Sequence, residues 1–135
     1  RRMGSSVWQA SGLSDREREL TILTVARTLE SAYEWYQHAR IALDAGVPRE
    51  DILAVSRGEY DSFSPSDRAL VRYVEAFTDR TVDDGTHAEL AEHFDEATIV
   101  GVGMLASYYI GIDYMGDAFD LEMEDEFVGW ELENV

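Results

Sequence analysis

The sequence contains no cysteine, which removes several kinds of chemistry at once. Without cysteine the chain can form no disulfide, no thiolate nucleophile and no cysteine-ligated zinc site. Redox chemistry would need a cofactor, and because no cofactor motif is present we expect none. His87 and His93 lack a third ligand at a useful spacing, so we expect no metal site either.

Positive charge is also scarce. All 11 basic residues are arginines, with no lysine among them, and they stand against 28 acidic residues, which gives a formal net charge of −17. Such a surface repels nucleic acids and anionic membranes, so neither is an expected partner. Self-repulsion of this size points to a host with a salty cytoplasm, where ions screen the charge. The other explanation is a high-GC genome that replaces lysine by arginine, and of the two we favour the halophile.

Long apolar runs are missing as well. Residues 97–112 come closest to the roughly 18 apolar residues of a membrane span, but Gly101, Ser107 and Gly111 interrupt them, which favours a buried helix. We find no secretory signal and expect a cytoplasmic protein. The hydrophobic content of 45% is sufficient for one domain with a substantial core.

Helix signals occur along the whole chain, and no segment alternates apolar and polar residues as a strand does. Residues 14–17 and 86–89 have the spacing of capping boxes, while Ser64-Pro65 and Asp95 mark two further helix starts. These signals predict an all-α, single-domain bundle of six helices. The expected helices span about residues 14–29, 31–45, 48–57, 65–80, 86–94 and 95–118.

The two ends of the chain differ from this pattern. Residues 1–12 look like the end of a truncated helix, and we expect an N-terminal segment there. Residues 121–135 form an acidic tail, which we expect to pack only through Phe127 and Trp130. The last helix is apolar on more than one side and contains glycines that let another backbone approach closely, which predicts a homo-oligomer.

Acidic and basic side chains cluster on two of the expected helices. Glu19 falls on the apolar face of helix 14–29, where a carboxylate needs a partner or a function. Glu34 and His38 lie four residues apart, on one face of the next helix. The three can form a general acid/base cluster, because burial raises a carboxyl pKa and histidine exchanges protons near neutral pH. The other interpretation is structural, with Glu34 and His38 as a helix-stabilising pair.

The stretch LSDRERELTILTVARTLESAYEWYQHARIALDAGVPREDI, residues 13–52, resembles the carboxymuconolactone decarboxylase family, which shares its all-helical fold with alkylhydroperoxidase D. The similarity covers residues 13–120. The peroxidase branch of the family has a Glu, then Cys-x-x-Cys, then a His. Glu19 and His38 match the Glu and the His, but Ser31 and Glu34 stand at the cysteine positions. Thiol peroxidase activity is therefore not expected, and a Glu four residues before the His resembles the decarboxylase branch.

The resemblance implies a cofactor-free enzyme that transfers protons on a small lactone or enolisable carboxylic acid, and a trimer or hexamer. In this assignment His38 is the main proton donor or acceptor, Glu34 is its orienting or relaying partner, and Glu19 is a second acid. The candidate substrate-binding residues are Ser31, Tyr109 and Arg27. An anionic substrate would need a cation, and only Arg27 and Arg40 lie near the motif. The alternative is a non-catalytic ligand-binding or scaffold protein of the same fold.

Overall fold

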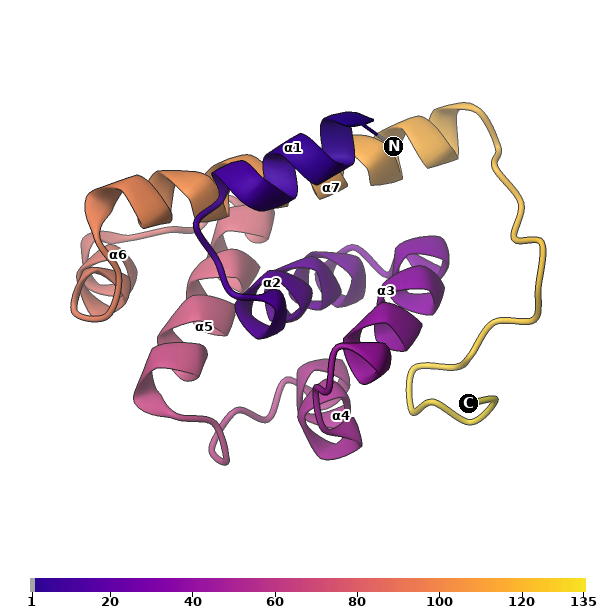
Figure 1. Cartoon of the computed structure of the whole chain (residues 1–135), viewed down its shortest axis with the longest axis horizontal. Helices are drawn as coiled ribbons and strands as arrows, with labels where there is room; N and C mark the ends of the chain where they lie inside the picture. The colour runs from indigo at the N-terminus through magenta and orange to yellow at the C-terminus, as the bar shows by residue number, and fades with distance from the viewer. Residues whose placement is uncertain (1) are drawn as a thin grey trace.

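The structure, a computed structural model, describes residues 2–135. Over this range the regular secondary structure is entirely helical (Figure 1), which confirms the all-α expectation. The predicted number of six helices is wrong by one, because residues 2–10 form a helix of their own. The helices of the described range are α1 (Arg2–Ala10), α2 (Asp15–Thr28), α3 (Ala32–Asp44), α4 (Arg49–Arg57), α5 (Pro65–Asp79), α6 (Asp84–Ala91) and α7 (Glu96–Ala118).

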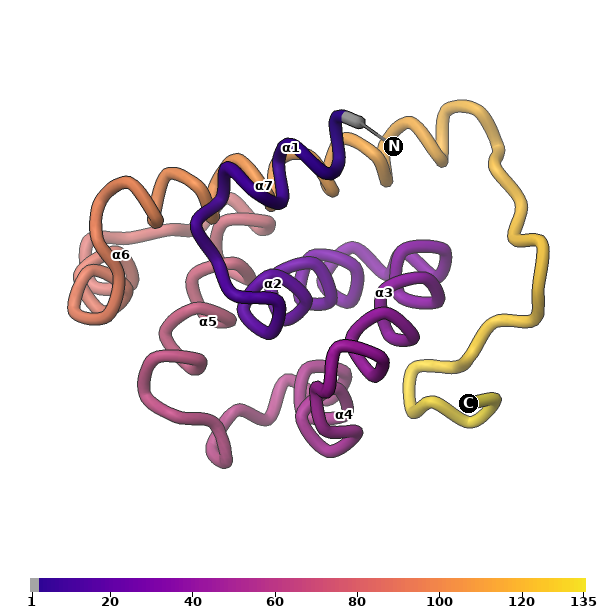
Figure 2. The backbone as a smooth tube through the Cα atoms, viewed as in Figure 1, coloured from indigo at the N-terminus to yellow at the C-terminus, as the bar shows by residue number. Residues whose placement is uncertain are grey.

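Helix α1 lies alongside α7 (Figure 2) and is held there by contacts between residues far apart in the sequence. The indole Nε1 of Trp8 donates a hydrogen bond of 2.7 Å to the hydroxyl of Tyr109. Just after α1, the backbone of Ser11 approaches α7 at Gly101, where a Cβ would lie 2.2 Å from the Ser11 carbonyl oxygen. A helix of nine residues is marginal by itself. Its stability comes from this packing, which the local sequence signals do not reveal.

Helix α2 is the central helix, in contact with α3, α4, α5 and α7. It starts with the expected capping box, in which Ser14 and Glu17 each accept a hydrogen bond from the backbone N–H of the other. Residues 19–26 are all buried, so this helix is covered on every side and not along one stripe. It separates two core clusters, to which it contributes Leu20, Leu23 and Ala26 on one side and Ile22 and Val25 on the other.

Two other helix starts agree with the sequence signals, because Ser64 caps α5 and Asp95 caps α7 through their side chains. The capping box predicted at residues 86–89 is wrong. Helix α6 begins earlier, at the cap residue Asp83, whose carboxylate accepts hydrogen bonds of 2.7 Å from both the backbone N–H and the hydroxyl of Thr86. The threonine hydroxyl is thereby a donor within the first turn and not the cap itself.

The segment after α7 returns along the molecule to α3 and α4 (Figure 1). Val128 and Leu132 are fully buried in the same core cluster as α3, while Phe127 and Trp130 pack against it only partly buried. The indole N–H of Trp35 donates a hydrogen bond of 3.0 Å to the carbonyl of Gly129. The tail is therefore held to the core by two fully buried residues and a hydrogen bond, and not only by Phe127 and Trp130.

Helix α7 has a buried face and an outward apolar face. Gly101 lies on the buried face, against Ser11, whereas a Cβ at Gly111 would meet no atom within 4 Å. The exposed large apolar residues of α7 are Val100, Met104, Tyr114 and Met115. Within the part of the chain that the structure describes, no helix is long and apolar enough to cross a membrane.

Candidate functional site

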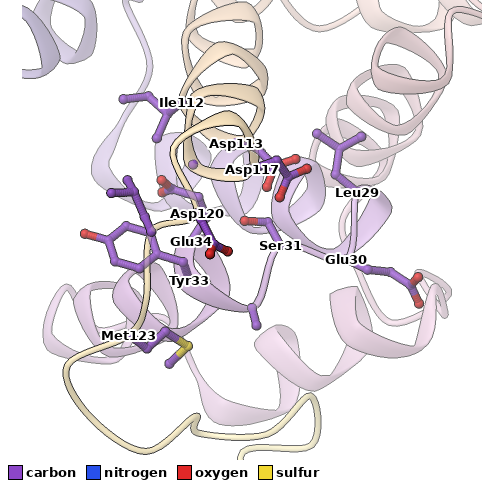
Figure 3. Close-up of a pocket in the computed structure, with 13 residues that line it drawn as sticks. Leu29, Glu30, Ser31, Tyr33, Glu34, Ile112, Asp113, Asp117, Asp120 and Met123 are labelled. Atoms are coloured by element: carbon purple, nitrogen blue, oxygen red, sulfur yellow. The ribbon is translucent and has the colours of Figure 1, made fainter.

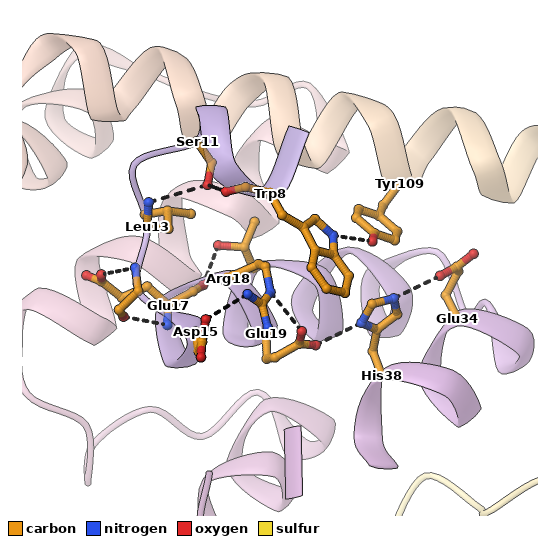
Figure 4. Close-up of polar contacts among 12 residues, drawn as sticks. Trp8, Ser11, Leu13, Asp15, Glu17, Arg18, Glu19, Glu34, His38 and Tyr109 are labelled. Atoms are coloured by element: carbon orange, nitrogen blue, oxygen red, sulfur yellow. Dashed lines mark hydrogen bonds and ion pairs between the residues drawn. The ribbon is translucent and has the colours of Figure 1, made fainter. Parts of the chain in front are cut away.

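The three residues singled out from the sequence meet in the interior of the protein (Figure 4). Glu19 comes from the first turns of α2, and Glu34 and His38 come from successive turns of α3. Their exposed fractions are 0% for Glu19, 5% for Glu34 and 4% for His38. A row of three buried ionisable groups is costly to fold unless the groups compensate one another or act on a ligand.

The inner end of the row is a tightly bonded pair. The Nδ1 atom of His38 lies 2.8 Å from Oε2 of Glu19. The other oxygen of Glu19 accepts a hydrogen bond of 3.0 Å from Nε of Arg18. The Nη1 atom of the same arginine pairs with Asp15 at 2.8 Å. Because an ionised carboxylate can only accept hydrogen bonds, we assign the proton of the contact with Glu19 to Nδ1 of His38, which leaves the lone pair of a neutral His38 on Nε2.

The outer end of the row is looser. Oε2 of Glu34 lies 3.6 Å from Nε2 of His38, which is longer than a hydrogen bond. Burial raises the pKa of the Glu34 carboxyl, an effect that His38 opposes and that Asp113 reinforces. Glu34 therefore holds a proton at higher pH than an ordinary glutamate and stands next to a nitrogen that can exchange it.

Aromatic residues from two other helices cover His38. The ring of Tyr109 stands perpendicular to the imidazole, with the ring centroids 5.0 Å apart, and the Trp8 ring is 6.2 Å away. The guanidinium of Arg18 lies 4.2 Å from the centre of the Trp8 ring. Burial also raises the pKa of the Tyr109 hydroxyl, which keeps it protonated. Sequence reasoning missed Trp8, because its role depends on how α1 sits against α7.

A cavity of about 410 Å³ opens beside Glu34 (Figure 3). Its walls are the connection between α2 and α3, the C-terminal turns of α7, and the first residues of the tail. Ser31 and Glu34 line it, whereas Glu19, His38 and Tyr109 do not. The cavity therefore meets the row of ionisable groups only at Glu34, and His38 lies behind it.

Three aspartates that sequence reasoning did not single out also line this cavity. They are Asp113, Asp117 and Asp120. Asp113 and Asp117 lie one turn apart on α7, and this spacing was the only signal in the sequence that they share a face.

The two arginines near the motif have other neighbours. Nε of Arg27 donates a hydrogen bond of 3.0 Å to the Ser56 carbonyl, and its guanidinium lies 4.6 Å from the centre of the Trp130 ring. Arg27 lines a different cavity, of about 210 Å³, and Arg40 lies over the Tyr36 ring. Neither belongs to the cavity beside Glu34. Within residues 2–135, no group of three or more potential ligands is arranged to hold a metal ion.

The protein is thus all-helical, with a buried row of one histidine and two glutamates that ends at the wall of a cavity. The model of the carboxymuconolactone decarboxylase family matches residues 1–76, more than half of the chain, so the chain belongs to this family. The matched region contains Glu19, Glu34 and His38 but not α7 or the tail. In a comparison with curated proteins, none matches the chain.

Proposed function

We propose that this protein is a cofactor-free acid/base enzyme that transfers protons on a small lactone or enolisable carboxylic acid. One observation carries the proposal: Glu34, a buried carboxyl group with a raised pKa, lies between the cavity and His38. A carboxyl group whose pKa is raised by burial, at the wall of a cavity, is suited to general acid/base catalysis. Membership of the decarboxylase family agrees with this type of chemistry.

The order of the row suggests how the proton moves. In a decarboxylation, the C–C bond to the leaving carboxyl group breaks, CO₂ departs, and the electron pair stays on the remaining carbon as an enolate. Neutral Glu34 then donates its proton to that carbon and becomes a carboxylate. The imidazole of His38 beside it can then pass a proton back to this carboxylate through Nε2. Glu34 is thus the group that contacts substrate, which reverses the roles that the sequence suggested for Glu34 and His38.

The inner part of the row has a supporting role in this scheme. Glu19, held by Arg18, fixes the ring of His38 through Nδ1 at 2.8 Å. Trp8 and Tyr109 close the other side of the imidazole. Nε2 of His38 faces Glu34, the member of the row that lines the cavity.

Solvent deuterium exchange tests the proposed chemistry directly. The parent protein should catalyse deuterium incorporation at an enolisable carbon of at least one member of a panel of small lactones and keto acids. His38→Gln and Glu34→Gln should each lower this rate by about 10² to 10⁴, the usual contribution of a positioned acid or base. An exchange rate equal to that of buffer with the parent protein, on every member of the panel, would contradict the proposal.

We also propose that the protein forms a homo-oligomer, of which a trimer or hexamer is the form that the family resemblance implies. The support is the outward face of α7, where Val100 and Met104 are each 57% exposed and Phe119, just beyond the helix, is 69% exposed. Several large apolar side chains exposed along one helix are typical of a surface that another protein chain covers.

A further inference from the structure

The smaller cavity, of about 210 Å³, is lined by residues of α2, α4 and α5 and of the turn that follows α4. Helices α4 and α5 both pack against α2 (Figure 1). None of the described residues that line this cavity belongs to the row of ionisable groups or to the cavity beside Glu34. Its volume is below the roughly 300–1,000 Å³ of sites for drug-sized molecules, so it suits a ligand of a few heavy atoms.

One buried polar atom in the wall of this cavity has no partner. Ser56 lines the cavity and is only 7% exposed. Among the buried side-chain nitrogen and oxygen atoms of residues 2–135, its Oγ alone makes no hydrogen bond. The buried hydroxyls of Thr24 and Thr78, by contrast, each donate a hydrogen bond of 2.7 Å to a carbonyl of their own helix. An unpartnered buried hydroxyl is costly, and a ligand that bonds to it removes this cost.

The lining also contains guanidinium groups with free donors. Nε of Arg27 donates to the Ser56 carbonyl, and Nε and Nη2 of Arg57 donate to Glu131. Within the described residues, Nη2 of Arg27 and Nη1 of Arg57 have no hydrogen-bond partner. A small carboxylate can accept hydrogen bonds from both guanidinium groups.

The same lining contains carboxylates that match a positive group. Glu75 and Asp79 lie one turn apart on α5. Glu75 accepts a hydrogen bond of 2.7 Å from the Tyr60 hydroxyl, whereas Asp79 has no hydrogen bond or ion pair with any residue that the structure describes. The last turns of α2, α4 and α5 all contribute to the cavity, and the partial negative charge at helix C-termini favours a cation. An ammonium group, with three donors on one atom, fits this side.

We propose that this cavity binds a small zwitterion, such as an α-amino acid. The carboxylate of the ligand accepts hydrogen bonds from Arg27, Arg57 and Oγ of Ser56, and its ammonium group lies against Glu75 and Asp79. Because the ligand has no net charge, the acidic surface of the protein neither attracts nor repels it from a distance. The inference is independent of the proposed acid/base function, since the two cavities share no lining residue.

Alanine and its two halves test whether both charges of the ligand are needed. Propanoate lacks the ammonium group of alanine, and ethylamine lacks its carboxylate. Binding is measured by NMR titration of the backbone amides at neutral pH and about 0.5 M KCl, which screens the general attraction of a −17 surface for cations. Alanine should bind at least about tenfold more tightly than either half. Ethylamine or propanoate binding as tightly as alanine, or no saturable binding of alanine, would overturn the inference.

Two arginine variants separate this cavity from general effects of charge. Arg57 pairs with Glu131 and Arg72 pairs with Glu89, and the side chains of the two arginines are 49% and 50% exposed. Arg57→Gln and Arg72→Gln therefore each remove one positive charge and one exposed ion pair, but only Arg57 lines the cavity. Arg57→Gln should lower the affinity for alanine about tenfold, and Arg72→Gln should keep the parent affinity. Equal losses in both would refute a built site.

Ser56→Ala separates a ligand contact from a structural role. Without ligand, this variant should be at least as stable as the parent, because it loses a buried hydroxyl that has no partner. Saturating alanine should raise the Tm of the parent, and it should raise the Tm of the variant by less. A variant that is less stable than the parent without ligand, or that responds to alanine as the parent does, would contradict the role given to Ser56.

Discussion

Replacing Gly101 by alanine tests how α1 sits against α7. A Cβ at this position would lie 2.2 Å from the carbonyl oxygen and 2.8 Å from Cα of Ser11, and no rotamer change can move these backbone atoms away. Helix propensity favours alanine over glycine by roughly 0.5–1 kcal/mol, whereas overpacking costs about 1–3 kcal/mol. Because the clash is with backbone, we expect a net loss of about 1–2 kcal/mol and a Tm lower by roughly 3–10 °C.

Gly111→Ala on the same helix is the matched control. Nothing lies within 4 Å of a Cβ at Gly111, so this substitution should raise stability by roughly 0.5–1 kcal/mol. Thermal unfolding followed by circular dichroism gives both differences. Tryptophan fluorescence reports Trp8, whose hydrogen bond to Tyr109 should loosen when the Gly101→Ala substitution displaces the end of α1. A Gly101→Ala protein as stable as the parent would refute the close approach of the Ser11 backbone to α7.

Three further predictions concern pH, salt and assembly. Burial raises the pKa of Glu34 above 4.5, so the stability that its neutral form contributes is complete below pH 4.5 and is lost as the pH rises through the raised value. Glu34→Gln should therefore melt at a higher temperature than the parent at about pH 8 and at a similar temperature at about pH 4; a lower Tm of the variant at pH 8 would contradict this. With a net charge of −17, the Tm should rise steeply between low salt and molar KCl, and a Tm independent of salt would favour the high-GC explanation of the composition. Light scattering at high salt should give a homo-oligomer, and Met104→Glu should weaken it; a monomer of the parent at micromolar concentration would contradict the assembly.

Local signals in the sequence were sufficient for the starts of α2, α5 and α7 and for the row of ionisable groups. Ser14, Ser64 and Asp95 cap helices where the sequence placed them, because a cap depends on residues only three positions apart. Glu34 and His38 face one another because residues four apart share a helix face. Glu19 could be predicted to join Glu34 and His38 because it falls on the apolar side of its own helix.

Features that depend on contacts between distant segments could not be predicted in this way. Trp8 belongs to the site only because α1 packs on α7, and Val128 is buried only because the tail returns to α3. The start of α6 was misplaced because Asp83 and Thr86 compete for the same cap, and both are good capping residues. The cavity itself was invisible, since its walls come from three segments that are far apart in the chain.

The return of the tail to the core has a consequence for how this protein can change. Residues 119–127 leave the end of α7 and reach Val128, which is fully buried, so this stretch is a loop fixed at both ends. On its way it supplies Asp120, Leu121 and Met123 to the cavity. Insertions or deletions in an exposed loop of this kind disturb the fold little. Variation in its length or sequence can therefore alter the size and charge of the cavity while Glu19, Glu34 and His38 keep their places on α2 and α3, so that the lining of the cavity and the row of ionisable groups can evolve separately.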